Sequence, residues 1–144
     1  MTTTVGHYLA TRLEQIGLDH YFQVPGDYNL QLLDELLKND NLKMMSCTNE
    51  LNAAYAAEGY ARANGASACV ITFNVGAFSA LNGVAGAYAE RLPMIFISAG
   101  YNTNDEASGR FLHHTIGTTD YSYQEEMFRL SLIHISEPTR LGMI

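Results

Sequence analysis

The chain has 144 residues, enough for one domain with a proper hydrophobic core, and its hydrophobic content of 47% is ordinary for a globular protein. Acidic residues outnumber basic residues by 15 to 8, which gives a formal net charge of −7. Nucleic-acid binding calls for a basic face, so this charge balance favours a globular domain with no nucleic-acid partner.

The sequence shows no signal for a membrane or a secreted location. No stretch approaches the roughly 20 apolar residues of a membrane span, and the N-terminus lacks the basic and apolar regions of a signal peptide. The two cysteines, Cys47 and Cys69, are too few for a secreted disulfide scaffold, and their apolar neighbours predict that both are buried. We therefore expect a cytoplasmic protein with reduced cysteines and no membrane partner.

Hydrophobic spacing divides the first part of the chain into helices and strands. Apolar residues recur at helical spacing over 5–16 and 30–37, and Gly17 marks the end of the first of these helices. Short apolar runs at 20–24 and 42–47 predict strands, and a Pro-Gly turn closes the first of them.

The second part of the chain alternates in the same way. Thr48 and Asn49 are good N-cap residues for an alanine-rich helix. Gly83 and Gly86 lie within a later helix, where each costs about 1 kcal/mol relative to Ala, which predicts close backbone contact with a neighbouring element. The predicted elements are helices at 49–64, 76–90 and 121–128, strands at 68–73 and 93–98, and a polar loop at 100–110. This alternation predicts an α/β fold, a parallel sheet with helices on both faces.

Ligands of open parallel sheets bind beyond the carboxyl ends of the strands. Asp27, Glu50 and Gly76 follow the first three predicted strands. The loop after the fourth strand leads to His113 and His114, so all these groups are expected along one sheet edge. On position alone, a turn role for Asp27 and a helix-start role for Glu50 are the simpler explanations. The adjacent histidines are expected to point in different directions, so no metal site is predicted.

Several segments together carry a resemblance to a known family. Two motifs are the most specific, Asn49-Glu50-Leu51-Asn52 and Leu112-His113-His114. The other matching segments are residues 4–10, 24–29, 57–62, 75–80 and 86–90. Together they resemble the N-terminal, pyrimidine-binding domain of bacterial pyruvate decarboxylases and indolepyruvate decarboxylases, which depend on thiamine diphosphate.

The resemblance implies roles for the residues at the predicted sheet edge. Glu50 would hydrogen-bond the N1′ atom of the cofactor's aminopyrimidine, and Gly76 would lie against the cofactor. Asp27, His113 and His114 would surround the reacting carbon as proton-transfer and orienting groups. Histidine suits such steps because its ordinary pKa lies near neutral pH.

The implied reaction is the non-oxidative decarboxylation of pyruvate, or of a bulkier 2-keto acid, to an aldehyde and CO₂. The cofactor's carbanion would add to the keto carbon, and an enamine would form after CO₂ leaves. The implied cofactors are thiamine diphosphate and Mg²⁺. Family members hold Mg²⁺ through a Gly-Asp-Gly…Asn motif, which this sequence lacks, so its ligands would lie in a separate diphosphate-binding domain.

Members of the family are several times longer than this chain and assemble so that the cofactor lies between two subunits. The resemblance therefore implies a homodimer or homotetramer for the full-length protein and an inactive fragment here. We expect residues 1–129 to form an incomplete pyrimidine-binding domain. Residues 130–144 resemble the translation of a sequencing adapter and are predicted to be a non-native tail.

Two other functions stay open. A carboligase of the same superfamily, such as an acetohydroxyacid synthase, shares the glycine-rich segments, although the His-His motif argues against it. A non-catalytic binding module could also use this fold.

Overall fold

The computed structural model describes residues 3–129 and 131 as a parallel sheet between helical layers. The elements in chain order are α1 (Val5–Gln15), β1 (His20–Gln23), α2 (Leu30–Leu36), β2 (Lys43–Ser46), α3 (Glu50–Asn64), β3 (Ser67–Ile71), α4 (Val75–Ala89), β4 (Met94–Ser98), α5 (Thr103–Ser108) and α6 (Tyr123–Phe128). The predicted tail at 130–144 lies outside the described residues except for Ser131. None of the helices in the described part is long and apolar enough to cross a membrane.

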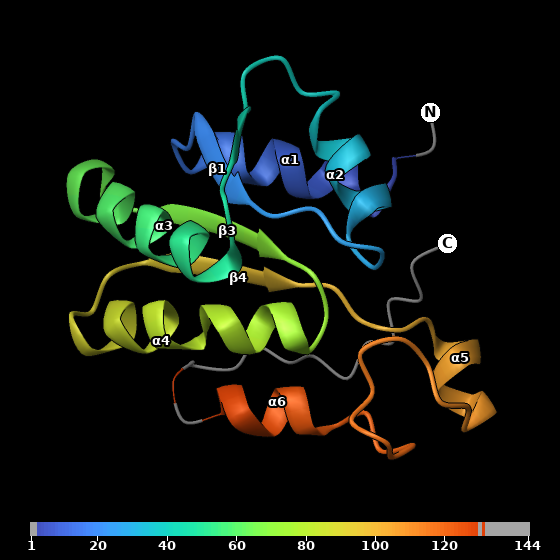
Figure 1. Ribbon diagram of the computed structural model, residues 1–144. Helices are drawn as coiled ribbons and strands as arrows, with labels where there is room; N and C mark the ends of the chain where they lie inside the picture. The colour runs from blue at the N-terminus through green and yellow to red at the C-terminus, as the bar shows by residue number, and fades with distance from the viewer. Residues whose placement is uncertain (1–2, 130, 132–144) are drawn as a thin grey trace.

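The four strands run parallel in the order β2-β1-β3-β4. Helices α1 and α2 cover one face of the sheet, while α3, α4 and α6 lie on the other (Figure 1). This arrangement confirms the predicted α/β fold with helices on both faces. Strand β3 is buried at every position because it lies in the interior of the sheet and is covered on both sides.

Two apolar layers hold the helices to the sheet. On one face, leucines of α1 and α2 pack against β1 and β3, with Leu13 and Leu36 almost fully buried. On the other face, the small residues of α3 and α4 pack against Cys69 and Ile71. Cys69 is buried as predicted, but Cys47 is only partly buried because it directly follows the edge strand β2.

The prediction of a loop at 100–110 is wrong over more than half of that range, because Thr103–Ser108 forms α5. The Asn102 side chain accepts hydrogen bonds from the backbone N–H groups of Asn104 and Asp105, at 3.0 and 2.9 Å. Gly109 then ends the helix in the left-handed region, at φ 60°. The segment is polar because none of the residues of this helix is buried, and its cap residues were the available signal.

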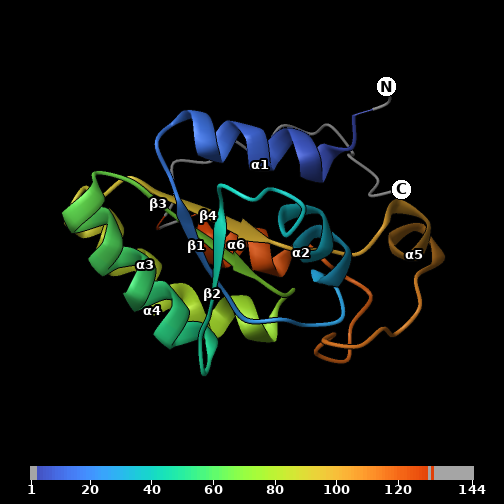
Figure 2. The ribbon, with the colours of Figure 1, turned by 90° about the horizontal axis from the view of Figure 1, so that it is seen from above.

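Close contact between α3 and α4 explains one glycine of the predicted pair. The two helices run alongside each other, as Figure 2 shows from above. A Cβ atom added at Gly83 would lie 2.6 Å from the Ala54 Cβ and 3.2 Å from the Ala54 carbonyl carbon. At Gly86 the nearest atom would be 3.8 Å away, an ordinary contact, so the predicted close approach is confirmed for Gly83 alone.

The Gly83→Ala substitution is therefore expected to destabilise the fold by about 1–3 kcal/mol, since the added methyl group must push the α3 backbone away. The matched control is Gly59→Ala in α3, where the added methyl group meets nothing within 4 Å. This control is expected to stabilise the chain by up to about 1 kcal/mol through helix propensity. Urea unfolding followed by circular dichroism measures both, and a higher midpoint for Gly83→Ala would contradict the packing argument.

Candidate functional site

The turn after β1 is fixed by a buried asparagine. The Asn29 side chain accepts a hydrogen bond from the Gly26 backbone N–H (2.8 Å) and donates one to the Val24 carbonyl oxygen (2.9 Å). Gly26 is required here because a Cβ atom would lie only 2.5 Å from the Cβ of Thr72. These contacts hold the backbone on both sides of Asp27, which follows directly after Gly26.

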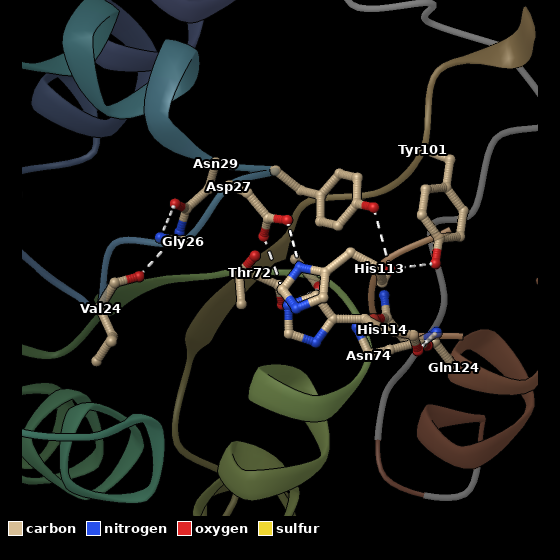
Figure 3. Close-up of polar contacts among 12 residues, drawn as sticks. Val24, Gly26, Asp27, Asn29, Thr72, Asn74, Tyr101, His113, His114 and Gln124 are labelled. Atoms are coloured by element: carbon tan, nitrogen blue, oxygen red, sulfur yellow. Dashed lines mark hydrogen bonds and ion pairs between the residues drawn. The ribbon is translucent and has the colours of Figure 1, made fainter. Parts of the chain in front are cut away.

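Asp27 lies between two imidazoles that come from a segment more than eighty residues later in the chain. His113 Nδ1 is 2.6 Å from one carboxylate oxygen of Asp27, and His114 Nε2 is 3.5 Å from the other (Figure 3). The structure therefore brings three of the predicted site residues together at the carboxyl edge of the sheet.

The prediction that the adjacent histidines point in different directions is wrong. Their ring centroids are only 4.0 Å apart. The reason is the backbone of His114, which adopts φ 70°, a left-handed conformation that is uncommon for residues other than glycine. This turn in the chain brings both side chains to the same carboxylate.

Hydroxyl and amide donors hold the backbone of the two histidines in place. The Tyr28 and Tyr101 hydroxyls donate to the His113 carbonyl oxygen, at 3.0 and 2.7 Å. The Asn74 amide donates to the His114 carbonyl oxygen at 3.1 Å. Burial raises the pKa of both tyrosines, which keeps their hydroxyl groups protonated and able to donate.

Sequence reasoning assigned no role to these supporting residues. Tyr28, Asn74 and Tyr101 each lie a few residues past the end of a strand, so their position at the carboxyl edge was the available signal. Asn74 is fully buried with φ 47° and precedes α4. A strained, buried polar residue of this kind persists only where its surroundings determine it.

The charge state of Asp27 follows from its neighbours. Partial burial raises the pKa of this carboxyl group, but the hydrogen bond from His113 and the charges of both imidazoles outweigh burial. The pKa of Asp27 therefore lies below its ordinary value, and the group is an anion at neutral pH. An anion between two imidazoles can orient both rings and stabilise a proton on either.

Glu50 begins α3 and faces the start of α4. Asn49 caps α3 by accepting a hydrogen bond from the Asn52 backbone N–H (2.9 Å), so the cap does not use the Glu50 carboxylate. A Cβ atom at position 76 would lie 3.0 Å from Glu50 Oε1 and 2.7 Å from Thr72 Cγ2. Gly76 thus leaves room beside the partly buried carboxylate of Glu50.

Thr72 connects the two parts of the site. Its side chain touches the positions where Cβ atoms would lie at both Gly26 and Gly76. It therefore packs between the turn that carries Asp27 and the helix start that faces Glu50. Among residues 3–129, no hydrogen bond or ion pair joins Glu50 to the Asp27 cluster, which consists of Asp27, His113 and His114. The site therefore consists of two groups separated by Thr72.

The comparison with known families gives the context for this arrangement. The family model described as "Thiamine pyrophosphate enzyme, N-terminal TPP binding domain" matches residues 3–127, which include every predicted site residue. The chain belongs to this family. In this chain, the matched residues 3–127 adopt the α/β fold described above.

The similar proteins include pyruvate decarboxylases from fungi and plants. The chain is 59% identical over 140 residues to a probable pyruvate decarboxylase of Schizosaccharomyces pombe, covering 95% of this chain and 24% of that protein. It is 60% identical over 124 residues to the pyruvate decarboxylase of Neurospora crassa, covering 86% of this chain and 22% of that protein. For pyruvate decarboxylase 2 of Arabidopsis thaliana the identity is 55% over 126 residues, or 88% of this chain and 21% of that protein.

Two facts follow from these relatives. The chain spans about a quarter or less of their length. They come from fungi and a plant, so the narrower resemblance to bacterial enzymes finds no support in them.

The observed groups fit the aminopyrimidine end of thiamine pyrophosphate. The N1′ nitrogen of the aminopyrimidine needs a hydrogen-bond acceptor when it carries a proton, and a carboxylate is such an acceptor. Glu50 presents a carboxylate from the first turn of α3. Gly76 adds no side chain beside the Glu50 carboxylate. A Cβ atom at position 76 would lie 2.7 Å from Thr72 Cγ2, so a larger residue would collide with Thr72. The catalytic assignments of Glu50 and the Asp27 cluster remain predictions.

Proposed function

We propose that this chain forms the aminopyrimidine side of the active site of a thiamine-diphosphate-dependent pyruvate decarboxylase, which converts pyruvate to an aldehyde and CO₂. The observation that carries the proposal is the approach of both imidazoles, from His113 and His114, to the Asp27 carboxylate at the carboxyl edge of the sheet. The names of the relatives support pyruvate as the substrate. A bulkier 2-keto acid is the alternative within the same reaction.

Glu50 would hold a proton at the N1′ atom of the aminopyrimidine. Its place in the first turn of α3 fixes the carboxylate, and the glycine at position 76 keeps the adjoining space free. When bound, thiamine diphosphate supplies the electron sink that lets the substrate lose CO₂. Glu50 would favour the cofactor tautomer that can start this chemistry, so its contribution is general acid–base catalysis.

Asp27, His113 and His114 would manage the proton that the decarboxylated carbon requires before the aldehyde leaves. The anionic Asp27 orients both rings and stabilises an imidazolium by charge. His113 is largely exposed, whereas His114 is mostly buried, with 71% and 16% of their side-chain surfaces accessible. His113 is therefore in contact with solvent, whereas His114 lies on the inner side of the Asp27 carboxylate.

Further parts of the proposed enzyme lie outside this chain. The sequence contains no Gly-Asp-Gly motif, so we assign Mg²⁺ and the diphosphate group to a second domain supplied by another subunit. The proposed assembly is a homodimer or homotetramer in the cytoplasm. By itself the chain is expected to bind thiamine diphosphate weakly and to be inactive.

A chimera tests the proposal directly. Residues 3–127 replace the corresponding segment of the Neurospora crassa pyruvate decarboxylase, to which the chain is 60% identical. With thiamine diphosphate and Mg²⁺, the chimera is expected to form an aldehyde from pyruvate, measured through NADH oxidation by alcohol dehydrogenase. A folded chimera that binds the cofactor but yields acetolactate would support the carboligase instead. One that binds the cofactor and forms neither product would favour the non-catalytic module.

A further inference from the structure

The Asp27 cluster has the composition of a metal site as well as that of a proton relay. Asp27, His113 and His114 each offer one ligand atom, and these atoms lie within 4.8 Å of one another. Figure 3 shows both imidazoles turned toward the carboxylate. Among the described residues, this is the cluster in which three potential ligands come together.

We propose that Asp27, His113 and His114 bind one divalent transition-metal ion of the Zn²⁺ type, with one ligand atom from each residue and water completing the coordination. Two imidazoles and one carboxylate are the protein ligands of several open tetrahedral zinc sites. Mg²⁺ and Ca²⁺ are poor candidates, since they prefer sites made of oxygen ligands.

The geometry requires only a small adjustment. The contact between His113 Nδ1 and the Asp27 carboxylate, now 2.6 Å, must open so that the ion lies between the two atoms. Metal–ligand bonds of about 2.0–2.2 Å then replace the direct hydrogen bond. His113 can make this movement because 71% of its side chain is exposed.

The backbone on either side of the cluster is already ordered. The carbonyl oxygen of His113 accepts hydrogen bonds from the Tyr28 and Tyr101 hydroxyls, and the carbonyl oxygen of His114 accepts one from the Asn74 amide. The left-handed backbone of His114 brings both rings to the same carboxylate. Little conformational freedom therefore remains to be lost when an ion binds, which favours binding.

The cluster is also accessible. The side chain of Asp27 is 47% exposed, so an ion and its water ligands can reach the carboxylate from solvent. His114 is mostly buried and provides the inner ligand. The chain's net charge of −7 adds a general attraction for cations.

Such an ion has a functional consequence that rests on the proposed function. It would occupy the same nitrogen and oxygen lone pairs that are assigned to proton transfer. An enzyme with this ion bound would be inhibited, and removing the ion would restore it.

Cobalt titration of the purified 144-residue chain tests the site. Co²⁺ is expected to bind at one ion per chain with the strong visible absorption of four-coordinate cobalt, and Zn²⁺ is expected to displace it. The His113→Gln, His114→Gln and Asp27→Asn variants should each weaken binding by at least about tenfold, the loss seen when even an indirect support of a metal site is removed. Circular dichroism checks that each variant is folded.

The matched control is His20→Gln. His20 also contacts a carboxylate, with Nδ1 2.6 Å from Asp19, but no third potential ligand joins this pair in the part of the chain that the structure describes. Unchanged cobalt binding in this variant, together with weakened binding in the other three, supports the site. The proposal is overturned if Co²⁺ does not bind at one ion per chain, or if His20→Gln weakens binding as much as His113→Gln does.

This titration separates the metal site from the proposed function because it needs neither thiamine diphosphate nor activity. Cobalt binding by the chain supports the site even if the chimera is inactive. An active chimera whose chain fails to bind cobalt rules out the metal site and leaves the decarboxylase proposal in place.

Discussion

Glu50→Gln in the chimera should lower kcat by about 10²–10⁴-fold, the range for losing a general acid–base group. The amide keeps the size and shape of the side chain, so its fit beside Gly76 is preserved. It cannot hold or release the proton that the aminopyrimidine requires. The loss is therefore expected in kcat measured with saturating thiamine diphosphate, with the same coupled assay.

The control for Glu50 lies on the same helix. Glu58 forms an ion pair with Arg62 at 2.6 Å, away from the carboxyl edge of the sheet. Glu58→Gln removes an equal charge from α3, and kcat is expected to stay near that of the unaltered chimera. Equal losses in the two variants would mean that helix charge, and not a proton at the cofactor, explains the effect of Glu50.

The order and type of the main elements could be predicted because the deciding signals are local. The left-handed Gly17 just after α1, the Asn49 cap at the start of α3 and the left-handed Gly65 at its end each act over one helical turn. The uniformly apolar run around β3 requires burial on both faces, and this alone indicates a central parallel strand. Predicted and observed boundaries consequently differ by only a few residues.

The position of the candidate residues at one edge of the sheet could also be predicted, because all strands of a parallel sheet end at the same edge. Which of these residues touch could not be predicted. Contact between Asp27 and His113 joins segments 86 residues apart, and no local pattern encodes it.

The histidine pair shows where sequence reasoning reaches its limit. In extended or helical backbone, adjacent side chains diverge, so two histidines in sequence predict no shared partner. The convergence on Asp27 depends on φ 70° at His114. That angle is maintained by the Asn74 amide and the tyrosine hydroxyls, which become neighbours only once the sheet has formed.

Asp27→Asn should separate function from stability. In the chimera, kcat is expected to fall by about 10²–10⁴-fold, since the neutral amide can neither stabilise an imidazolium nor orient both rings by charge. The stability of the isolated chain should change by less than about 1 kcal/mol, because the Asp27 side chain is 47% exposed and solvent screens its charge. Urea unfolding of the chain and turnover by the chimera are measured side by side.

The pH dependence of this small stability difference has a definite sign. The folded-state pKa of Asp27 lies below its ordinary value of about 3.9, so the contact with the imidazoles stabilises the fold fully above that value. The stabilisation is lost as the pH falls through the lower folded-state pKa, and the Asp27→Asn variant should then match the unaltered chain.

Asp19→Asn is the matched control for Asp27. Asp19 makes the same 2.6 Å contact with the neighbouring His20, but at the amino end of β1, opposite the site. We expect this variant to have a similarly small effect on stability and none on kcat. A loss of turnover equal to that of Asp27→Asn would show that any aspartate–histidine pair supports the fold of the chimera. A loss confined to Asp27 ties the effect to the carboxyl edge, where the reacting carbon is proposed to lie.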